Sequence, residues 1–174
     1  MTRSENVTKK QGKLGIVSST EYISVGGIEN VPAKIDTGAD SSSVWASNIE
    51  VTDKGILRFT LFAPGSKYYT GEVLERIDFA ASSVKSSNGI KQIRYRAKIP
   101  IIINGRKIKV LATLSDRSKN HFPVLIGRKT LSGRFLVDVS KSKVERPHDP
   151  KRFTKELKED PIKFHQKYFK KDNK

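Results

Sequence analysis

Cysteine is absent from this sequence of 174 residues, which excludes a disulfide framework, a thiolate nucleophile and any metal site built on cysteine. Aromatic residues make up only 8% of the chain, and no basic stretch interleaves them as a base-stacking surface requires. No run approaches the roughly 18 apolar residues of a membrane-spanning helix, and residues 1–13 lack the apolar segment of a signal peptide. We therefore expect a cytoplasmic protein that does not enter a membrane.

The usual signatures of metal and cofactor chemistry are also missing. The histidines His121, His148 and His165 are scattered and match no metal-ligand spacing. The chain contains no HExxH zinc motif, no Walker A loop and no GxGxxG loop. The serine triplet at 41–43 lacks the GxSxG context of a nucleophile elbow. The sequence therefore predicts neither a metal nor a nucleotide cofactor.

Positive charge is abundant and spread along the chain. The formal net charge is +16, of which residues 151–174 carry +5 and residues 1–13 carry +3, leaving +8 for residues 14–150. Such a field attracts acidic peptides, nucleic acid and anionic surfaces, and it says little about fold. One interpretation is therefore a non-catalytic basic β-barrel module that binds nucleic acid or another polyanion, with nucleic acid bound only non-specifically.

Alternating apolar residues and turn signals predict a β domain at residues 14–140. A basic tail at 1–13 precedes it, and a basic extension at 141–174 follows as a linker and a helical segment that Pro161 interrupts. Asn104-Gly105 between two apolar runs predicts a two-residue hairpin. Residues 128–133 are expected to form a short helix. The predicted strands are 14–17, 22–25, 31–35, 57–63, 68–79, 93–103, 107–114, 124–126 and 135–139.

The most informative motif is Asp36-Thr37-Gly38-Ala39, which directly follows an apolar strand. Apolar or small residues flank this turn, so its carboxylate is expected to be partly desolvated, as carboxyl groups used in chemistry often are. An apolar run ending in Gly127-Arg128 follows about ninety residues later. Asp-Thr-Gly alone is weak, but its combination with this second run is specific.

Five motifs in this order resemble the retropepsin-like aspartic proteases, and among them the bacterial and archaeal family formerly labelled putative ATP-dependent zinc proteases. They are AKIDTGA at 33–39, VKSSNG at 84–89, TLSDRS at 113–118, PVLIGR at 123–128 and GRFLVD at 133–138. The resemblance covers residues 14–140 and implies an all-β, single-lobe acid-protease barrel, with the basic extension outside it. Members of that family are associated with ATP-grasp ligases that add glutamate, which implies a functional link to such a ligase.

The resemblance also implies roles for individual residues. Asp36 would be the catalytic carboxylate, and a homodimer would supply the second one because the chain has a single Asp-Thr-Gly. Support of the active-site loop would come from Thr37, Gly38, Ala39, Asp40, Gly127 and Arg128, with an ion pair between Asp40 and Arg128. A flap over the substrate would comprise Lys85, Ser86, Ser87, Asn88 and Gly89. Asp116 and Arg117 would line the pocket wall or form a surface ion pair.

Two departures from the family pattern concern substrate preference. Asp40 stands where the family commonly has a basic residue, and Gln92 stands where a Glu is frequent. The basic domain nevertheless favours acidic substrates, because a glutamate-rich chain carries about one negative charge per residue at neutral pH. The sequence therefore predicts an aspartic endopeptidase acting on glutamate-rich peptides or glutamate-extended protein tails.

Overall fold

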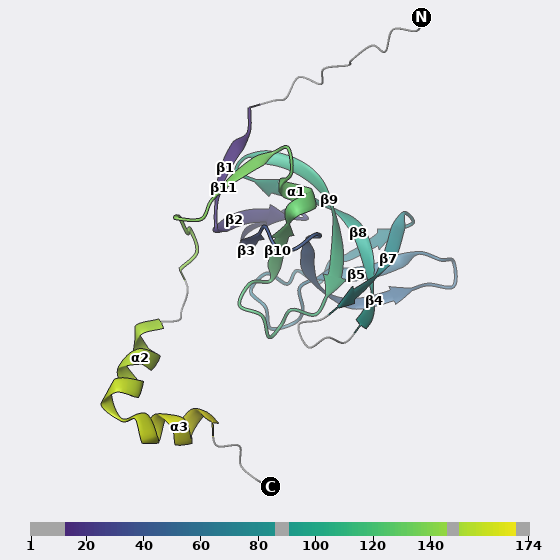
Figure 1. Ribbon diagram of the computed structural model, residues 1–174. Coiled ribbons are helices and arrows are strands. Elements are labelled where there is room, and N and C mark those ends of the chain that lie inside the picture. Colours follow the sequence, from purple (N-terminus) through teal and green to yellow (C-terminus); the bar gives the residue numbers. More distant parts are fainter. Residues whose placement is uncertain (1–12, 86–90, 146–149, 170–174) are drawn as a thin grey trace, which may run out of the picture. The chain divides into compact units, whose positions relative to one another are not determined.

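The computed structural model describes residues 13–85, 91–145 and 150–169 (Figure 1). The chain divides into two compact units, Met1–Val144 and Glu145–Lys174. Among the described residues, the first unit is built of strands with one short helix, and the second unit contains two helices.

The strands of the first unit largely follow the sequence prediction, with boundaries shifted by a few residues. In chain order the elements are β1 Gly15–Ser18, β2 Thr20–Val25, β3 Ile28–Asp36, β4 Ser43–Val51, β5 Leu57–Leu61, β6 Val73–Arg76, β7 Phe79–Lys85, β8 Lys91–Ile103, β9 Arg106–Ser115, β10 Val124–Gly127, α1 Arg128–Leu131 and β11 Phe135–Asp138.

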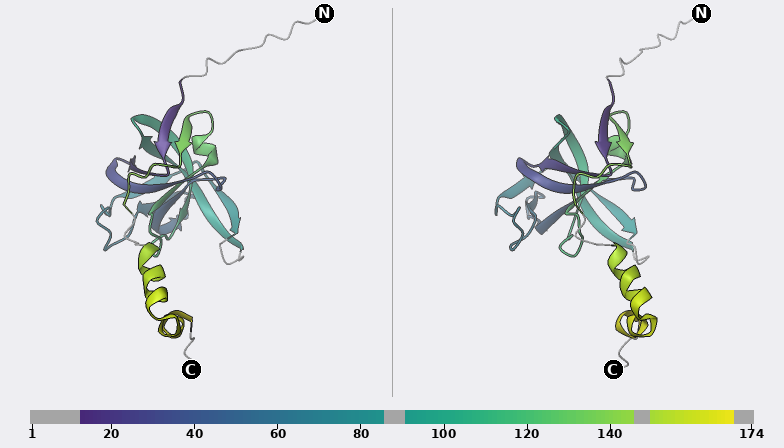
Figure 2. Two further views of the ribbon diagram at one scale, coloured as in Figure 1. Left: turned by 60° about the vertical axis from the view of Figure 1, so that its left-hand side comes forward. Right: turned by 90° about the vertical axis from the view of Figure 1, so that its left-hand side faces the viewer.

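Six of these strands close into a barrel. Hydrogen-bonded neighbours run in the order β10, β3, β2, β8, β9 and β4, and β4 pairs again with β10. Closure pairs each of the six strands on both sides, so none presents a full free edge. β5 and β6 extend the sheet beyond β4, and β7 pairs with β8 to form a hairpin that projects from the barrel (Figure 2). The predicted all-β barrel with a short helix after the apolar-Gly motif is therefore confirmed.

Aliphatic side chains and phenylalanines form one hydrophobic core in this unit. Phe59, Phe62 and Ile99 are fully buried, and their burial supplies the hydrophobic driving force for closure. The turn Asn104-Gly105 joins β8 to β9 with φ values of 48° and 75°. These left-handed angles are those of a type I′ hairpin turn, so the predicted two-residue hairpin is present.

β4 is a strand that the sequence analysis does not predict. Its inward-facing Val44 and Ala46 are at most 2% exposed, but Ser47 and Asn48 interrupt the apolar alternation. Asn48 has φ 51°, and the register of β4 against β5 shifts between Ser47 and Glu50. This irregularity hides the strand from pattern analysis, because alternation is readable only along a regular strand.

The continuous strand predicted at residues 68–79 is wrong. Residues 66–72 are turns and irregular backbone, with Gly71 at φ 75°. Only Val73–Arg76 pairs with β5, and β7 begins afresh at Phe79 against β8. The two pieces thus have different partner strands, which residue pattern alone does not reveal.

The polar segment after β11 is fixed to the start of β2. Ser19 N donates to the Lys141 carbonyl at 2.9 Å, and Val144 N donates to Thr20 Oγ1 at 2.9 Å. Lys143 Nζ lies 2.8 Å from Oε2 of Glu21, whose side chain is 2% exposed. Residues 141–144, which the sequence analysis assigns to a linker, therefore satisfy a buried carboxylate of the barrel.

The second unit consists of α2 Pro150–Glu159 and α3 Pro161–Phe169. Pro161 is the first residue of α3, a position that tolerates proline because its missing N–H has no helical partner there. Glu156 of α2 accepts hydrogen bonds from Arg152 Nε at 3.0 Å and from the Tyr168 hydroxyl at 2.9 Å. None of the described helices is long and apolar enough to cross a membrane.

Candidate functional site

The loop that carries Asp36 begins where β3 ends. Gly38 N and Ala39 N donate hydrogen bonds of 3.0 and 3.2 Å to Oδ1 of Asp36. Asp36 is half-buried, while Thr37 and Gly38 are exposed. The backbone thus holds one carboxylate oxygen in place and leaves the other oxygen, Oδ2, to interact with groups outside the chain.

The apolar-Gly run lies directly behind this loop. β10 pairs in parallel with β3, which places Gly127 beside Asp36 in register. Arg128 N donates to the Ala39 carbonyl at 2.7 Å. A Cβ atom at Gly127 would lie 2.6 Å from the carbonyl carbon and oxygen of Ser41 and 2.8 Å from the Ala39 oxygen. Glycine is therefore required here by space, because Gly127 has extended backbone angles (φ −90°, ψ 173°) that any residue adopts.

A buried hydroxyl pair completes the packing behind the loop. Gly127 N donates to Ser42 Oγ at 3.1 Å, and Ser42 Oγ lies 2.8 Å from Thr130 Oγ1. Both side chains are at most 6% exposed. This role of Ser42 is not predicted from the sequence, where the serine triplet at 41–43 only fails to match a nucleophile motif. A usable signal would be three small hydroxyl residues directly after the Asp-Thr-Gly turn, where buried backbone donors need hydrogen-bond acceptors.

Asp40 and Arg128 form the ion pair that the sequence analysis predicts. It joins the end of the Asp36 loop to the first residue of α1. The two side chains are 65% and 60% exposed, so the pair belongs to the surface class worth about 0.2–1 kcal/mol. Removing one partner should therefore not cost the several kcal/mol of stability that are lost when a buried ion pair is broken.

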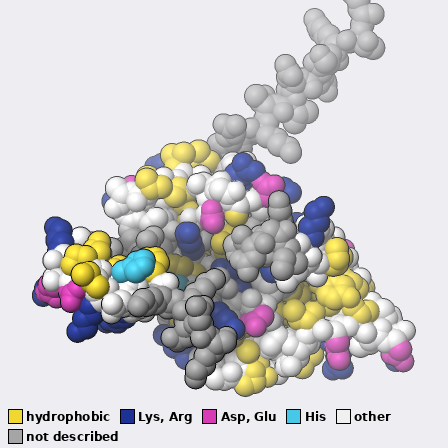
Figure 3. Space-filling model, turned by 60° about the horizontal axis from the view of Figure 1, so that its bottom comes forward, with side chains coloured by type: hydrophobic (Ala, Val, Ile, Leu, Met, Phe, Trp, Pro, Cys, Tyr) yellow, Lys and Arg dark blue, Asp and Glu magenta, His cyan; other side chains and the backbone are white. Residues whose placement is uncertain are grey.

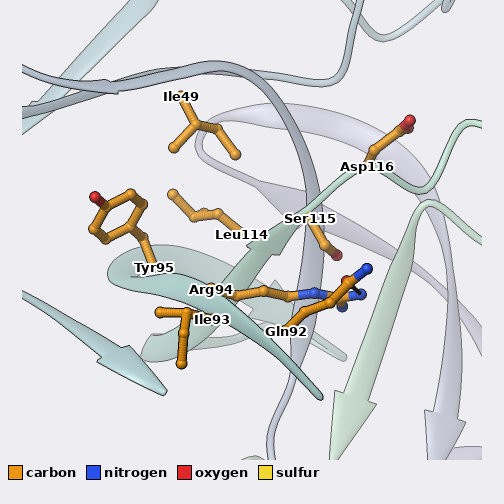
Figure 4. A pocket seen from close by; sticks show the side chains of 8 residues that line it. All are labelled: Ile49, Gln92, Ile93, Arg94, Tyr95, Leu114, Ser115 and Asp116. Atoms are coloured by element: carbon orange, nitrogen blue, oxygen red, sulfur yellow. Dashed lines mark hydrogen bonds between the residues drawn. The ribbon is translucent and has the colours of Figure 1, made fainter. Parts of the chain in front are cut away.

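Asp116 lies in a surface pocket of about 450 Å³ that is lined by residues 92–95 of β8, residues 114–116 at the end of β9, and Ile49. Figure 4 shows an apolar side formed by Ile49, Leu114 and Tyr95, and a polar side formed by Gln92, Arg94 and Ser115. Arg94 Nη2 donates to Gln92 Oε1 at 2.9 Å. Gln92, one of the two departures from the family pattern, thus faces the same pocket as Asp116.

Asp116 and Arg117 do not share a hydrogen bond with each other in the described structure. Asp116 Oδ1 accepts from Ser118 N at 2.8 Å, and this backbone bond is the main reason why the pKa of Asp116 is lowered. Arg117 Nε donates to the Phe122 carbonyl at 3.0 Å. Burial, and then the charge of nearby Arg94, lower the pKa of Arg117. Of the two, Asp116 lines the pocket and Arg117 braces the following loop.

The proposed flap falls almost wholly outside the described residues. Lys85 is the last residue of β7 and pairs with Lys91 of β8. Ser86, Ser87, Asn88 and Gly89 lie outside the described residues.

Lysine and arginine side chains are scattered over the barrel face seen in Figure 3, with fewer acidic side chains among them. On that face the positive charge is therefore dispersed, in keeping with the +8 counted for residues 14–150. Among the described residues, no group of three or more His, Asp or Glu side chains is arranged to hold a metal ion.

Comparison with known proteins connects this geometry to a family. A family model described as "RimB-like: Retropepsin-like aspartic endopeptidase RimB" matches residues 16–148. A protein of unknown function from Legionella pneumophila has a similar crystal structure, with a TM-score of 0.55 and 26% identity over 74% of this chain and 95% of that chain.

Curated relatives are longer proteins. A "Probable alpha-L-glutamate ligase" from Shewanella pealeana is 29% identical over 67% of this chain and 26% of its own length. One of the same name from Desulfotalea psychrophila is 26% identical over 78% of this chain and 29% of its own length. The chain thus spans less than a third of these relatives. The family model covers most of the barrel and confirms the resemblance seen in the five motifs. The chain belongs to the RimB-like family of retropepsin-like aspartic endopeptidases.

Proposed function

We propose that the protein hydrolyses peptide bonds with a water molecule held between the Asp36 carboxyl groups of two chains. The observation that carries this proposal is the fixed, half-exposed Asp36 on a loop braced by Gly127. Two backbone amides bind its Oδ1, so Oδ2 is the oxygen available to a water and to a second carboxyl group. One such group per chain is half of an acid–base pair, and a two-fold dimer supplies the other half.

The reaction needs two carboxyl groups that share one proton. The ionised group takes a proton from the water as its oxygen attacks the scissile carbonyl carbon. The protonated group donates its proton to the carbonyl oxygen, which gives a tetrahedral diol. The C–N bond then breaks as the nitrogen takes a proton from the protonated carboxyl group, while a diol hydroxyl gives its proton to the ionised one. This leaves the amine, a carboxylic acid and a pair that again shares one proton. Exposed Thr37 and Gly38 would lie at the dimer axis and beside the substrate backbone, respectively.

An apolar patch on β1 and β11 supports association of two chains. The parallel register pairs Ile16 with Leu136, and these side chains are 60% and 56% exposed. Leu14, just before β1, and Val139, just after β11, are also exposed, at 40% and 77%. Single exposed aliphatic residues are ordinary, but Ile16 and Leu136 lie side by side on paired strands, and association would cover them. A homodimer is therefore part of the proposal.

The substrate class follows from charge and from the relatives. The barrel is basic, and matched relatives carry the name glutamate ligase. We infer that the substrates are glutamate-rich peptides or glutamate-extended protein tails, made by a ligase of that kind. Long-range attraction would speed their capture, and salt would screen it over about 8–10 Å. Turnover of an oligoglutamate should therefore fall steeply with added salt, while turnover of a neutral peptide should not.

The decisive experiment compares the Asp36→Asn variant with the wild-type protein on an oligoglutamate. The variant keeps the side-chain shape but removes the shared proton, so hydrolysis should fall by about 10²–10⁴-fold or more. Asp53→Asn, in the exposed turn between β4 and β5, is the matched control and should retain full activity. Hydrolysis by Asp36→Asn at the wild-type rate would refute the proposal. So would undiminished specific activity in a species that sediments as a monomer.

The alternative function, polyanion binding without hydrolysis, is favoured only by the net charge of +16. It predicts that wild-type protein and Asp36→Asn bind nucleic acid equally well and that neither cleaves a peptide. The same experiment therefore separates the two functions.

A further inference from the structure

A second, smaller hollow of about 190 Å³ lies on the barrel between α1, β8, β9 and the serines that follow the Asp36 loop. Four cationic side chains line it: Arg96 of β8, Lys109 of β9, Lys129 of α1, and Arg134 just after α1. None of the described residues that line this basic pocket carries a carboxylate. The cations come from separate parts of the sequence and converge only in the folded barrel.

Arg96 carries a further signal. It is half-buried and lies opposite Thr113 in the register of β8 and β9. Its Nε atom is buried and has no hydrogen-bond partner among the described residues. The Nε atom of Arg58 is also buried without a hydrogen bond, but it lies 3.1 Å from a carboxylate oxygen of Glu75. A buried charged donor without an acceptor is costly, so Arg96 gains free energy if its guanidinium turns toward an anion bound in the pocket.

The walls of the basic pocket are held in place without a ligand. Ser42 and Thr130, which both line it, are joined by the buried 2.8 Å hydroxyl contact. Arg134 Nη1 donates to the carbonyls of Lys129, Thr130 and Ser132 at 3.3–3.4 Å. Binding to such a preformed site requires little ordering of side chains.

Part of the remaining lining is apolar. Ile108, Val110 and Leu111 of β9 contribute to it, and Leu111, 37% exposed, lies on the same face of the strand as Lys109. Cations beside aliphatic surface suit a ligand with a short apolar stem and a terminal anion. A glutamate side chain has two methylene groups and a carboxylate, which matches this mixture better than a phosphate group does.

The basic pocket is also close to the Asp36 loop along the chain. Ser41, which lines it, follows Asp36 by five residues, which span at most about 18 Å when fully extended. Ser42 accepts the 3.1 Å hydrogen bond from Gly127 N behind that loop. About six extended residues of a peptide would therefore span the straight-line separation of Asp36 and Ser41.

We propose that the basic pocket is an exosite that binds glutamate side chains of the substrate at a distance from the bond being cleaved. This inference rests on the proposed function and adds a length requirement to it. Oligoglutamates that reach from Asp36 to the pocket gain contacts with Arg96 and Lys109, and shorter ones do not. The site selects glutamate-rich tails over peptides with a single acidic residue.

The test measures binding and turnover of two labelled oligoglutamates. One has about three residues and is too short to span the separation of up to about 18 Å between Asp36 and Ser41, and the other has about ten residues and is long enough. Binding is measured by fluorescence anisotropy in the inactive Asp36→Asn protein, and kcat/KM is measured in the active one. Arg96→Gln should weaken binding of the long oligomer about tenfold, the loss expected for a charged hydrogen bond worth about 1.4 kcal/mol. Binding of the short oligomer should not change.

The matched pair Lys109→Gln and Lys54→Gln separates the basic pocket from the general field. Both lysines are exposed, and Lys54 lies in the turn between β4 and β5, away from the residues that line the pocket. Lys109→Gln should weaken only the long oligomer, and Lys54→Gln should change neither. Lys109→Gln also keeps the test valid if loss of the half-buried Arg96 disturbs folding.

Several outcomes would overturn the exosite. They are equal losses for both oligomers, equal effects of Lys109→Gln and Lys54→Gln, and no saturable binding to Asp36→Asn. Equal competition by an RNA oligonucleotide or by inorganic phosphate would show a general anion site instead. If the wild-type protein does not cleave oligoglutamate at all, the proposed function fails. The anisotropy measurements would still decide whether the basic pocket binds glutamate.

Discussion

Gly127→Ala is the substitution from which the structure gives the sharpest expectation. The added Cβ would lie 2.6 Å from the backbone of Ser41 and 2.8 Å from the Ala39 oxygen. Ordinary contacts begin near 3.4 Å, so the loop or β10 must move by about 0.8 Å. The atoms in the way are backbone atoms, which cannot rotate aside as a flexible side chain would. The loop that moves is the one that carries Asp36.

Two quantities should change in Gly127→Ala. Overpacking of this kind lowers the free energy of unfolding by about 1–3 kcal/mol, measured from urea denaturation. A displacement near 1 Å in a catalytic constellation lowers activity by about 100-fold, measured as kcat/KM on an oligoglutamate. The backbone angles of Gly127 are allowed for alanine, so the effect is purely steric. Partial unfolding does not explain such a loss of activity, because most molecules of the variant remain folded and unfolding alone would remove only the activity of the unfolded fraction.

Gly133→Ala is the control. Gly133 has φ 70° and open space where a Cβ would be placed. Alanine there costs about 1–2 kcal/mol through its left-handed conformation, and it leaves the Asp36 loop in place. The control should therefore lose stability and keep its activity. A Gly127→Ala protein with wild-type activity and stability would refute the argument that glycine is required behind the loop by space.

Two further predictions concern charge. Arg128→Gln breaks the exposed pair with Asp40 and should lower the free energy of unfolding by less than about 1 kcal/mol; a loss of several kcal/mol in urea denaturation would contradict the exposed geometry. The second prediction concerns Glu156, whose pKa is lowered from 4.5 to about 2, first by the hydrogen bond from Arg152 and then by that from Tyr168. A carboxyl group whose pKa is lower in the folded state stabilises that state at pH values above the pKa of the unfolded state. This stabilisation is lost as the pH falls toward the pKa of the folded state. The α2–α3 unit should therefore loosen between about pH 4.5 and 2, seen as a change in the Tyr168 ring signals by NMR, and Glu156→Gln should remove that transition.

Sequence and structure agree best where the signal is local. The Asn104-Gly105 turn needs two residues with left-handed angles, and those residue types supply them. The Asp36-Thr37-Gly38 motif can be recognised from the sequence because its turn residues directly follow an apolar strand. The predictions fail at β4 and at residues 68–79, where the partner strand decides the outcome. Asn48 interrupts the pattern of a strand that is nevertheless paired, and the turns around Gly71 divide a segment that reads as continuous.

The sequence by itself determined the barrel class, the family resemblance and the position of the carboxylate at Asp36, because motif order and strand alternation are written along the chain. Tertiary structure alone decided which distant groups meet. Ser42 is 85 residues from its hydrogen-bond donor Gly127 and 88 residues from its hydroxyl partner Thr130. Arg96, Lys109, Lys129 and Arg134 likewise form one pocket only after the barrel closes. Local propensity acts over a few residues, whereas these contacts arise from close packing of β10 and α1 behind the Asp36 loop.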